Sequence, residues 1–187
     1  MTQPTAANIP ARGTGNLVLL ITAVCGLALA PAASRAAGQA GCAANAHGRQ
    51  LDYWVGDWVV TNPGGAGNES SSTVRLALDQ CVVIENWSDH NGHDGENIFG
   101  YSEGDAGWRG MFFDNRGHVH VFVEGKVDAG AAEFSGPSRG AHGEALLNRI
   151  RLLRVAPDRL EQTWEKSADN GRTWTQQLRL EYARRAP

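Results

Sequence analysis

The stretch from Arg159 to Tyr182, RLEQTWEKSADNGRTWTQQLRLEY, predicts two long strands joined by one tight turn. Apolar and polar residues alternate on both sides of the turn, and this period of two is typical of antiparallel strands with one buried face and one wet face. The turn, Asp169-Asn170-Gly171, supplies residues that tolerate positive φ and bond to their own backbone. The stretch therefore predicts a β-hairpin in an all-β fold. We expect its apolar face to carry Trp164, Trp174, Leu178, Leu180 and Tyr182.

The same turn contains a recognisable motif, because Ser167 to Trp174 (SADNGRTW) resembles the Asp-box, S-x-D-x-G-x-T-W, of sialidase propellers. In such turns the Asp and Ser side chains bond backbone amides and the Trp packs under the turn. A propeller needs several blades of four strands each, for which a chain of 187 residues is too short. We therefore interpret the motif as a clasp on one hairpin and not as evidence for a sialidase.

The rest of the chain consists of short apolar runs separated by turn residues at intervals of roughly ten residues, with no sustained helical periodicity. These runs predict further strands at 51–61, 69–78, 81–88, 96–102, 108–114, 118–124, 131–135 and 146–155. Together with the hairpin they predict an all-β, antiparallel meander of about ten strands that closes into a lipocalin-like barrel.

For two of these strands, the sequence does not decide which face points into the barrel. Both faces of 108–114 are apolar, which predicts either an outer cover from the segment around Cys42 or an inner face that meets a ligand. In 118–124, the valines and the histidines occupy opposite faces. One interpretation places the valines inside and His118 and His120 in solvent. The other treats the two histidines as half of a Zn or Cu site, but no third and fourth ligands are evident, so no metal site is predicted.

The N-terminus predicts export. Arg12 precedes the apolar run from Leu17 to Ala30, and small residues follow it. This pattern is typical of a secretory signal peptide and is shorter than the roughly 20 apolar residues of a membrane span. We expect a signal peptide and cleavage region at 1–37, a lead-in at 38–50 and the barrel at 51–187, in a periplasmic or secreted protein with no stable membrane span after cleavage. A lipoprotein is the alternative.

Removal of the leader would discard Cys25 and leave Cys42 and Cys81. In an oxidising compartment this pair favours a disulfide, which would close a loop of roughly 40 residues and contribute about 3 to 4 kcal/mol in the chain-entropy model. Two unrelated buried thiols are the alternative.

Charge and motifs exclude several functions. The net charge is −3 and the basic residues are scattered, so no nucleic-acid partner is expected. The sequence carries no nucleophile elbow, phosphate-binding glycine loop or paired carboxylates, and no cofactor is predicted. Glu85, His118 and His120 remain as weak candidates for acid–base groups.

Four motifs in order carry a family resemblance: DYWVGDW at 52–58, CVVIENW at 81–87, WRGMFFD at 108–114 and the Asp-box turn. They resemble a family of exported bacterial proteins of unknown function, whose usual pattern is roughly F-D-F-W-x-G-x-W, G-C-x-x-x-E-x-W, W-x-Q-x-W-x-D and S-x-D-x-G-x-T-W. The resemblance implies a lipocalin-like barrel and no assigned activity. Gly110 stands where the family tends to have Gln, and Phe113 interrupts its aromatic pattern, which implies an altered or roomier pocket.

The barrel and its aromatic residues predict that a small apolar or amphipathic molecule binds inside. The residues that we expect to line this site are Trp87, Trp108, Gly110, Phe112 and Trp164. Gly110 is included because a missing side chain in mid-strand leaves space for a ligand or for a neighbouring tryptophan. A cofactor-free isomerase, cyclase or hydrolase on the same barrel is one alternative, and a structural envelope protein with a filled barrel is another.

Overall fold

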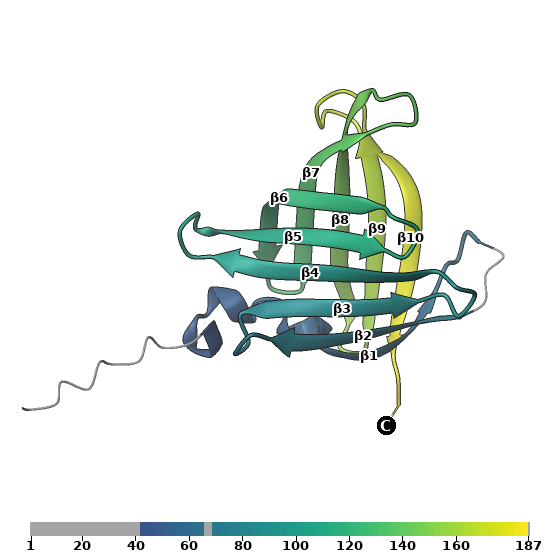
Figure 1. Cartoon of the computed structure of the whole chain (residues 1–187). Coiled ribbons are helices and arrows are strands. Elements are labelled where there is room, and N and C mark those ends of the chain that lie inside the picture. Colours follow the sequence, from purple (N-terminus) through teal and green to yellow (C-terminus); the bar gives the residue numbers. More distant parts are fainter. Residues whose placement is uncertain (1–41, 66–68, 187) are drawn as a thin grey trace, which may run out of the picture. The chain divides into compact units, whose positions relative to one another are not determined.

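A computed structural model describes residues 42–65 and 69–186, which all belong to one compact unit. These residues form one closed antiparallel barrel of ten strands (Figure 1). The strands are β1 (Gly56–Thr61), β2 (Ser70–Ala77), β3 (Val82–Ser88), β4 (Asp94–Ser102), β5 (Gly107–Asp114), β6 (Val119–Asp128), β7 (Ala131–Arg139), β8 (Ala145–Ala156), β9 (Arg159–Ser167) and β10 (Thr175–Arg184). The predicted all-β meander is confirmed. The predicted signal peptide, and Cys25 with it, lies outside the described residues.

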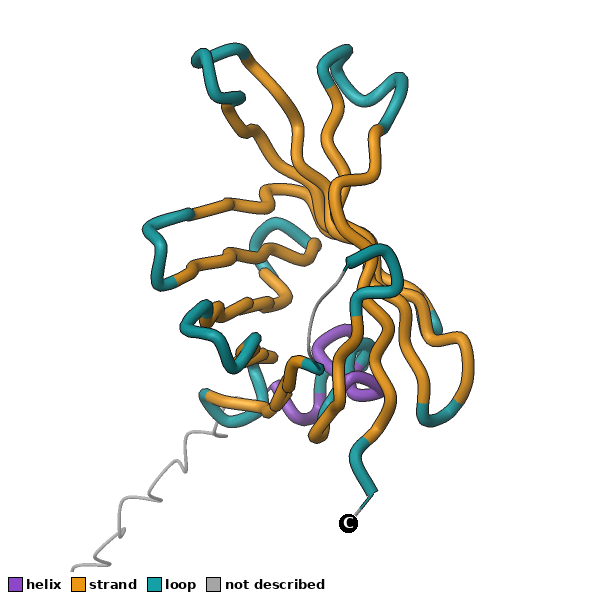
Figure 2. Tube along the Cα trace, turned by 90° about the vertical axis from the view of Figure 1, so that its right-hand side faces the viewer, coloured by secondary structure: helices purple, strands orange, loops and turns teal. Residues whose placement is uncertain are grey.

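Each strand pairs with the next along the chain, and β10 closes the barrel by pairing with β1, where Trp58 lies opposite Arg184. Strands β2 to β6 run roughly across strands β7 to β10, so the barrel consists of two crossed layers (Figures 1 and 2). Within the part of the chain that the structure describes, no helix is long and apolar enough to cross a membrane.

The β9–β10 hairpin ends in the clasp that the Asp-box motif predicts. Asp169 accepts hydrogen bonds from the amide (2.8 Å) and hydroxyl (2.7 Å) of Thr173, and Ser167 Oγ accepts one from the Gly171 amide (2.8 Å). The Trp174 indole donates to the Gly171 carbonyl. These bonds are all local to the turn, so the motif acts here as a folding element.

One part of the hairpin prediction is wrong, because Trp174 does not share the inner face with Leu178 and Tyr182. The register of β10 against β9 shifts between Gln176 and Leu178, which turns the start of β10 relative to its inner residues. The Trp174 ring instead stacks on the guanidinium of Arg149, 4.0 Å away, whose ion-pair partners belong to the outer face.

Three short 3-10 helices precede the barrel and plug one of its ends: η1 (Cys42–Ala44), η2 (His47–Arg49) and η3 (Asp52–Trp54). In Figure 2 they lie between the two strand layers. Leu51 and Trp54 are fully buried there, and the Trp58 indole donates to the Trp54 carbonyl at 2.8 Å. The predicted strand at 51–61 therefore begins only at Gly56, whose φ of 141° suits glycine.

The predicted disulfide between Cys42 and Cys81 is confirmed. It ties η1 to the turn that joins β2 and β3. Side chains add to this attachment: Arg49 donates to the Gln80 side chain at 2.9 Å, and the Trp108 indole donates to Gln50 at 3.0 Å.

The plugged end of the barrel, which we call the closed half, is filled by aromatic side chains. Phe99 lies at its centre, with ring centroids 4.2 Å from Phe134 and 5.9 Å from Trp54. A Cβ atom on Gly110 would lie 2.3 Å from the Phe99 ring. Space at Gly110 is therefore occupied by a neighbouring aromatic ring of the core.

The histidine–valine alternation is also resolved, and the interpretation that placed the valines inside is wrong. His120 and Phe122 face the interior, whereas Val119, Val121 and Val123 are 42–53% exposed. Met111 and Phe113 on β5 are likewise exposed on the outer face, so the segment around Cys42 does not cover β5 from outside. It enters the end of the barrel because Leu51 and Trp54 fit the core there.

Candidate binding cavity in the open half of the barrel

The end of the barrel opposite the plug, which we call the open half, contains a cavity of about 410 Å³. This volume lies in the lower part of the usual range for ligand pockets. Its apolar wall consists of Trp87, Phe112, Trp164, Leu178 and Leu180. Its polar residues include Glu85, Asn97, Gln162 and Tyr182 at the inner end and Asp114, His118, His120, Arg139 and Lys166 towards the mouth.

Three of the five predicted ligand-binding residues meet at this cavity: Trp87, Phe112 and Trp164. Trp108 and Gly110 share a strand face with Phe112 but lie deeper, in the closed half, where both are buried. Glu85, His118 and His120, which were the weak acid–base candidates, also line the cavity.

Aromatic rings brace the wall of the cavity. Trp164 meets Phe112 edge-on with centroids 5.1 Å apart, and meets His120 at 5.2 Å. Phe112 in turn stacks on His120 at 5.9 Å. Edge-on and offset contacts of this kind are favourable for aromatic pairs, and they hold the wall in one arrangement.

The inner end of the cavity is a polar floor built around Glu85, which is 1% exposed. Its carboxyl group contacts Ser72 Oγ at 2.7 Å, Asn97 Nδ2 at 2.8 Å and the Tyr182 hydroxyl at 2.9 Å. Burial raises the pKa of Glu85, and the hydrogen bonds oppose this only in part. Burial and the adjacent Glu85 also raise the pKa of Tyr182 well above its usual range.

With the Gln162 amide oriented as in this structure, proton counting favours a neutral Glu85 in this floor. The Tyr182 hydroxyl contacts both Glu85 Oε1 and Gln162 Oε1, the latter at 3.2 Å, but it has only one proton. A protonated Glu85 can donate to the Tyr182 oxygen, which leaves the phenol proton for Gln162. The raised pKa of Glu85 agrees with this arrangement.

Two side-chain atoms of the floor have no hydrogen-bond partner among residues 42–65 and 69–186: the carbonyl oxygen of Asn97 and the amide nitrogen of Gln162. The two residues are only 4% and 5% exposed. Buried polar groups are nearly always paired, so each such atom needs an explanation. Here one is an acceptor and the other a donor, and both residues line the cavity.

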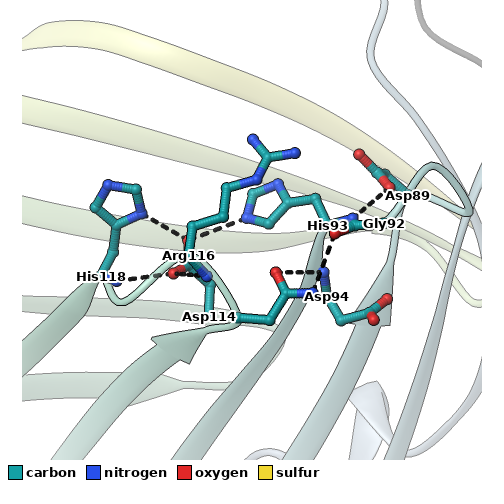
Figure 3. A network of polar contacts seen from close by, with 8 residues as sticks. Asp89, Gly92, His93, Asp94, Asp114, Arg116 and His118 are labelled. Atoms are coloured by element: carbon teal, nitrogen blue, oxygen red, sulfur yellow. Dashed lines mark hydrogen bonds and ion pairs between the residues drawn. The ribbon is translucent and has the colours of Figure 1, made fainter.

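At the mouth, Asp114 is held by two histidines (Figure 3). Its Oδ2 accepts from His118 Nδ1 at 2.7 Å and from His93 Nε2 at 3.0 Å, while Oδ1 accepts from the amides of Arg116 and His118. Burial alone would raise the pKa of Asp114, but the hydrogen bonds from His118 and His93 outweigh it and hold this pKa well below its usual range. Asp114 is therefore ionised, and its hydrogen bonds stabilise the β5–β6 turn.

His120 has a defined tautomer. As the Asn148 amide is oriented in this structure, its nitrogen lies 2.6 Å from His120 Nδ1. In this orientation the amide donates, Nδ1 accepts and the ring proton lies on Nε2. Burial, and then the positive charge of Lys166, lower the pKa of His120. His120 therefore brings a neutral N–H donor to the cavity beside the Lys166 ammonium.

The sequence prediction missed several cavity residues, among them Asn97, Gln162, Asp114 and Lys166. A usable pattern was present for two of them, because Gln162 and Lys166 fall in step with Leu160 and Trp164 on the inner face of β9. Only aromatic residues and Gly110 were predicted to line the site, whereas the interior is also polar at the depths of Gln162 and Lys166.

The described residues contain no group of three or more His, Cys, Asp or Glu side chains arranged to hold a metal ion. The arrangement offers instead a cavity with an apolar wall, neutral hydrogen-bonding groups at its inner end, and basic side chains together with the ionised Asp114 at its mouth. In comparisons with known proteins, no family model matches the chain and no curated protein matches it.

Proposed function

We propose that the protein is an exported binding protein that holds a small amphipathic molecule in the open half of its barrel. The observation that carries this proposal is the contrast inside one barrel: aromatic side chains fill the closed half, while a cavity of about 410 Å³ remains in the open half. An apolar wall with a few convergent polar groups is the usual composition of a small-molecule site. A wholly filled structural barrel is less well supported, because side chains do not fill the open half.

Export is part of the proposal and rests on the apolar run near the N-terminus and on the disulfide. The four sequence motifs support membership in the exported lipocalin-like family that they resemble. That membership stays a prediction.

Catalysis on the same scaffold is a second candidate, which one observation favours. His118 donates to the ionised Asp114 through Nδ1, so its other ring nitrogen can act as a base at the cavity mouth. A hydrolase or isomerase of this kind would lose activity in His118→Gln while keeping its affinity for the substrate. A plain binding protein would show no turnover in either form.

The experiment that tests binding is a titration with N-phenyl-1-naphthylamine, a neutral dye whose fluorescence rises in apolar surroundings. We expect the wild-type chain to bind the dye. Leu178→Trp, which places a larger ring in the cavity wall, should weaken binding at least about tenfold, corresponding to about 1.4 kcal/mol. The matched control, Leu153→Trp on the exposed outer face of β8, should bind like wild type. Equal dye binding by both variants would contradict the proposal.

A further inference from the structure

Strand β9 presents three kinds of side chain to the cavity, one after another from the floor to the mouth. Gln162, Trp164 and Lys166 alternate along the strand and all line the cavity. Consecutive strand residues are about 3.3 Å apart, so Gln162 and Lys166 lie roughly 13 Å from each other. A ligand along this strand therefore meets a neutral amide at the floor, an aromatic ring at mid-depth and a cation at the mouth.

The floor is suited to a hydroxyl group. Its two unpartnered atoms are one donor, Gln162 Nε2, and one acceptor, Asn97 Oδ1. A hydroxyl has one proton and two lone pairs, so it supplies both the acceptor that Gln162 lacks and the donor that Asn97 lacks. A carboxylate would suit this place badly, because it would lie beside the buried carboxyl of Glu85 without a nearby cation at the floor.

The mouth is suited to a carboxylate. Lys166 makes no ion pair with any residue that the structure describes, and neither does Arg139, which donates instead to the Gly143 carbonyl. His120 adds the N–H donor of its neutral ring beside Lys166. The acid at the mouth, Asp114, is already occupied by His93 and His118. An incoming anion therefore finds cationic donors without a competing internal partner.

We infer that the bound molecule is an amphipathic hydroxy acid whose hydroxyl group contacts Asn97 and Gln162 and whose carboxylate contacts Lys166. This inference rests on the proposed function and adds the chemical class and the orientation of the ligand. The apolar body between the two ends lies along Trp164 and is bounded by Phe112 and Leu180. Because the two ends are recognised separately, each can be tested separately.

The test is a calorimetric titration of the full chain with three probes of similar length: 10-hydroxydecanoate, decanoate, which lacks the hydroxyl, and decane-1,10-diol, which lacks the carboxylate. We expect 10-hydroxydecanoate to bind about tenfold or more tightly than either of the others, since each of them leaves one set of polar groups unpaired. Equal affinities for all three probes, or a preference for decanoate, would overturn the inference even if the neutral dye binds.

Two variants test which residue recognises each end of the ligand. Gln162→Leu should abolish the preference for 10-hydroxydecanoate over decanoate, and Lys166→Met should abolish the preference for 10-hydroxydecanoate over the diol. Lys126→Met is the matched control, because Lys126 is exposed and does not line the cavity. If the Lys126 and Lys166 variants change the affinities equally, the assigned carboxylate site is wrong. If no probe and no dye binds, the proposed function fails together with the inference.

Discussion

The two halves of the barrel are built from the same strands but differ in what faces inward. In the closed half, β4, β5 and β7 contribute Phe99, Trp108 and Phe134, which pack on Leu51 and Trp54 of the plug. In the open half, the same strand faces continue with the buried Asn97 and the half-buried Phe112, which both line a cavity. One alternating strand therefore fills the core at one depth and lines a cavity at another.

The largest difference between the halves is expected from phenylalanine truncation. Phe99→Ala should lower the free energy of unfolding by about 3 to 5 kcal/mol, because it empties a fully buried site. Phe112→Ala, in the open half, should lower it by no more than about 2 kcal/mol, since its ring is only partly buried. Urea unfolding measures both values. Equal losses would show that the open half is packed like the closed half.

The disulfide is expected to support the closed half alone. The double variant Cys42→Ser with Cys81→Ser should lose about 2 to 4 kcal/mol of stability, because the start of the plug is then held by non-covalent contacts alone. Chemical unfolding with and without the bond measures this loss. The folded variant should still bind N-phenyl-1-naphthylamine like wild type, and a parallel loss of binding would mean that the plug shapes the cavity.

Glu85 lies in the floor, at the boundary between the two halves. Its titration should make the stability of wild type depend on pH differently from that of Glu85→Gln. The folded pKa of Glu85 is raised, so its contribution to stability is fully present below the unfolded value of about 4.3 and is lost as pH rises through the folded pKa. Glu85→Gln removes this dependence. We expect the stability of wild type relative to Glu85→Gln to fall by up to about 1.4 kcal/mol per pH unit above that point.

Asp114 and Asp169 give stability the opposite dependence on pH. Their pKa values are lowered, so their contributions are present above the unfolded value and are lost as pH falls. Both residues are kept in the Glu85→Gln variant, so their effects cancel in the difference from wild type. A difference between the two proteins that stays flat from pH 4 to pH 8 would contradict a protonated Glu85.

The smallest effect is expected at the hairpin clasp. Hydrogen bonds from Thr173 and Ser167 lower the pKa of Asp169 to about 2, and all of its side-chain bonds stay within the turn. Asp169→Ala should therefore lower the melting temperature by a few degrees and leave dye binding unchanged. Loss of binding without a change in melting would place the turn in the functional site.

Strand positions and the disulfide could be predicted from the sequence because alternation, turn residues and cysteine number are local properties. The facing of β6 could not, since both of its faces offer a coherent pattern and only the barrel decides that His120 points inward. The sequence also does not show how deep in the barrel a residue lies. Trp108, Gly110 and Phe112 share one face, yet the first two belong to the core and only Phe112 lines the cavity. The polar floor was missed because only aromatic residues and Gly110 were expected to line the cavity, and contacts such as that between Tyr182 and Glu85 form only in the closed barrel.

The six tryptophans allow the central claim, that the open half binds a ligand while the closed half is filled, to be tested in one spectrum. Each indole N–H gives its own signal in a ¹H–¹⁵N correlation experiment, and 10-hydroxydecanoate can be added stepwise. We predict that the signals of Trp87 and Trp164 in the open half shift, while those of Trp54 and Trp108 in the closed half and of Trp174 on the outer face do not. Shifts at Trp54, Trp108 or Trp174 with Trp87 and Trp164 unchanged would contradict binding in the open half.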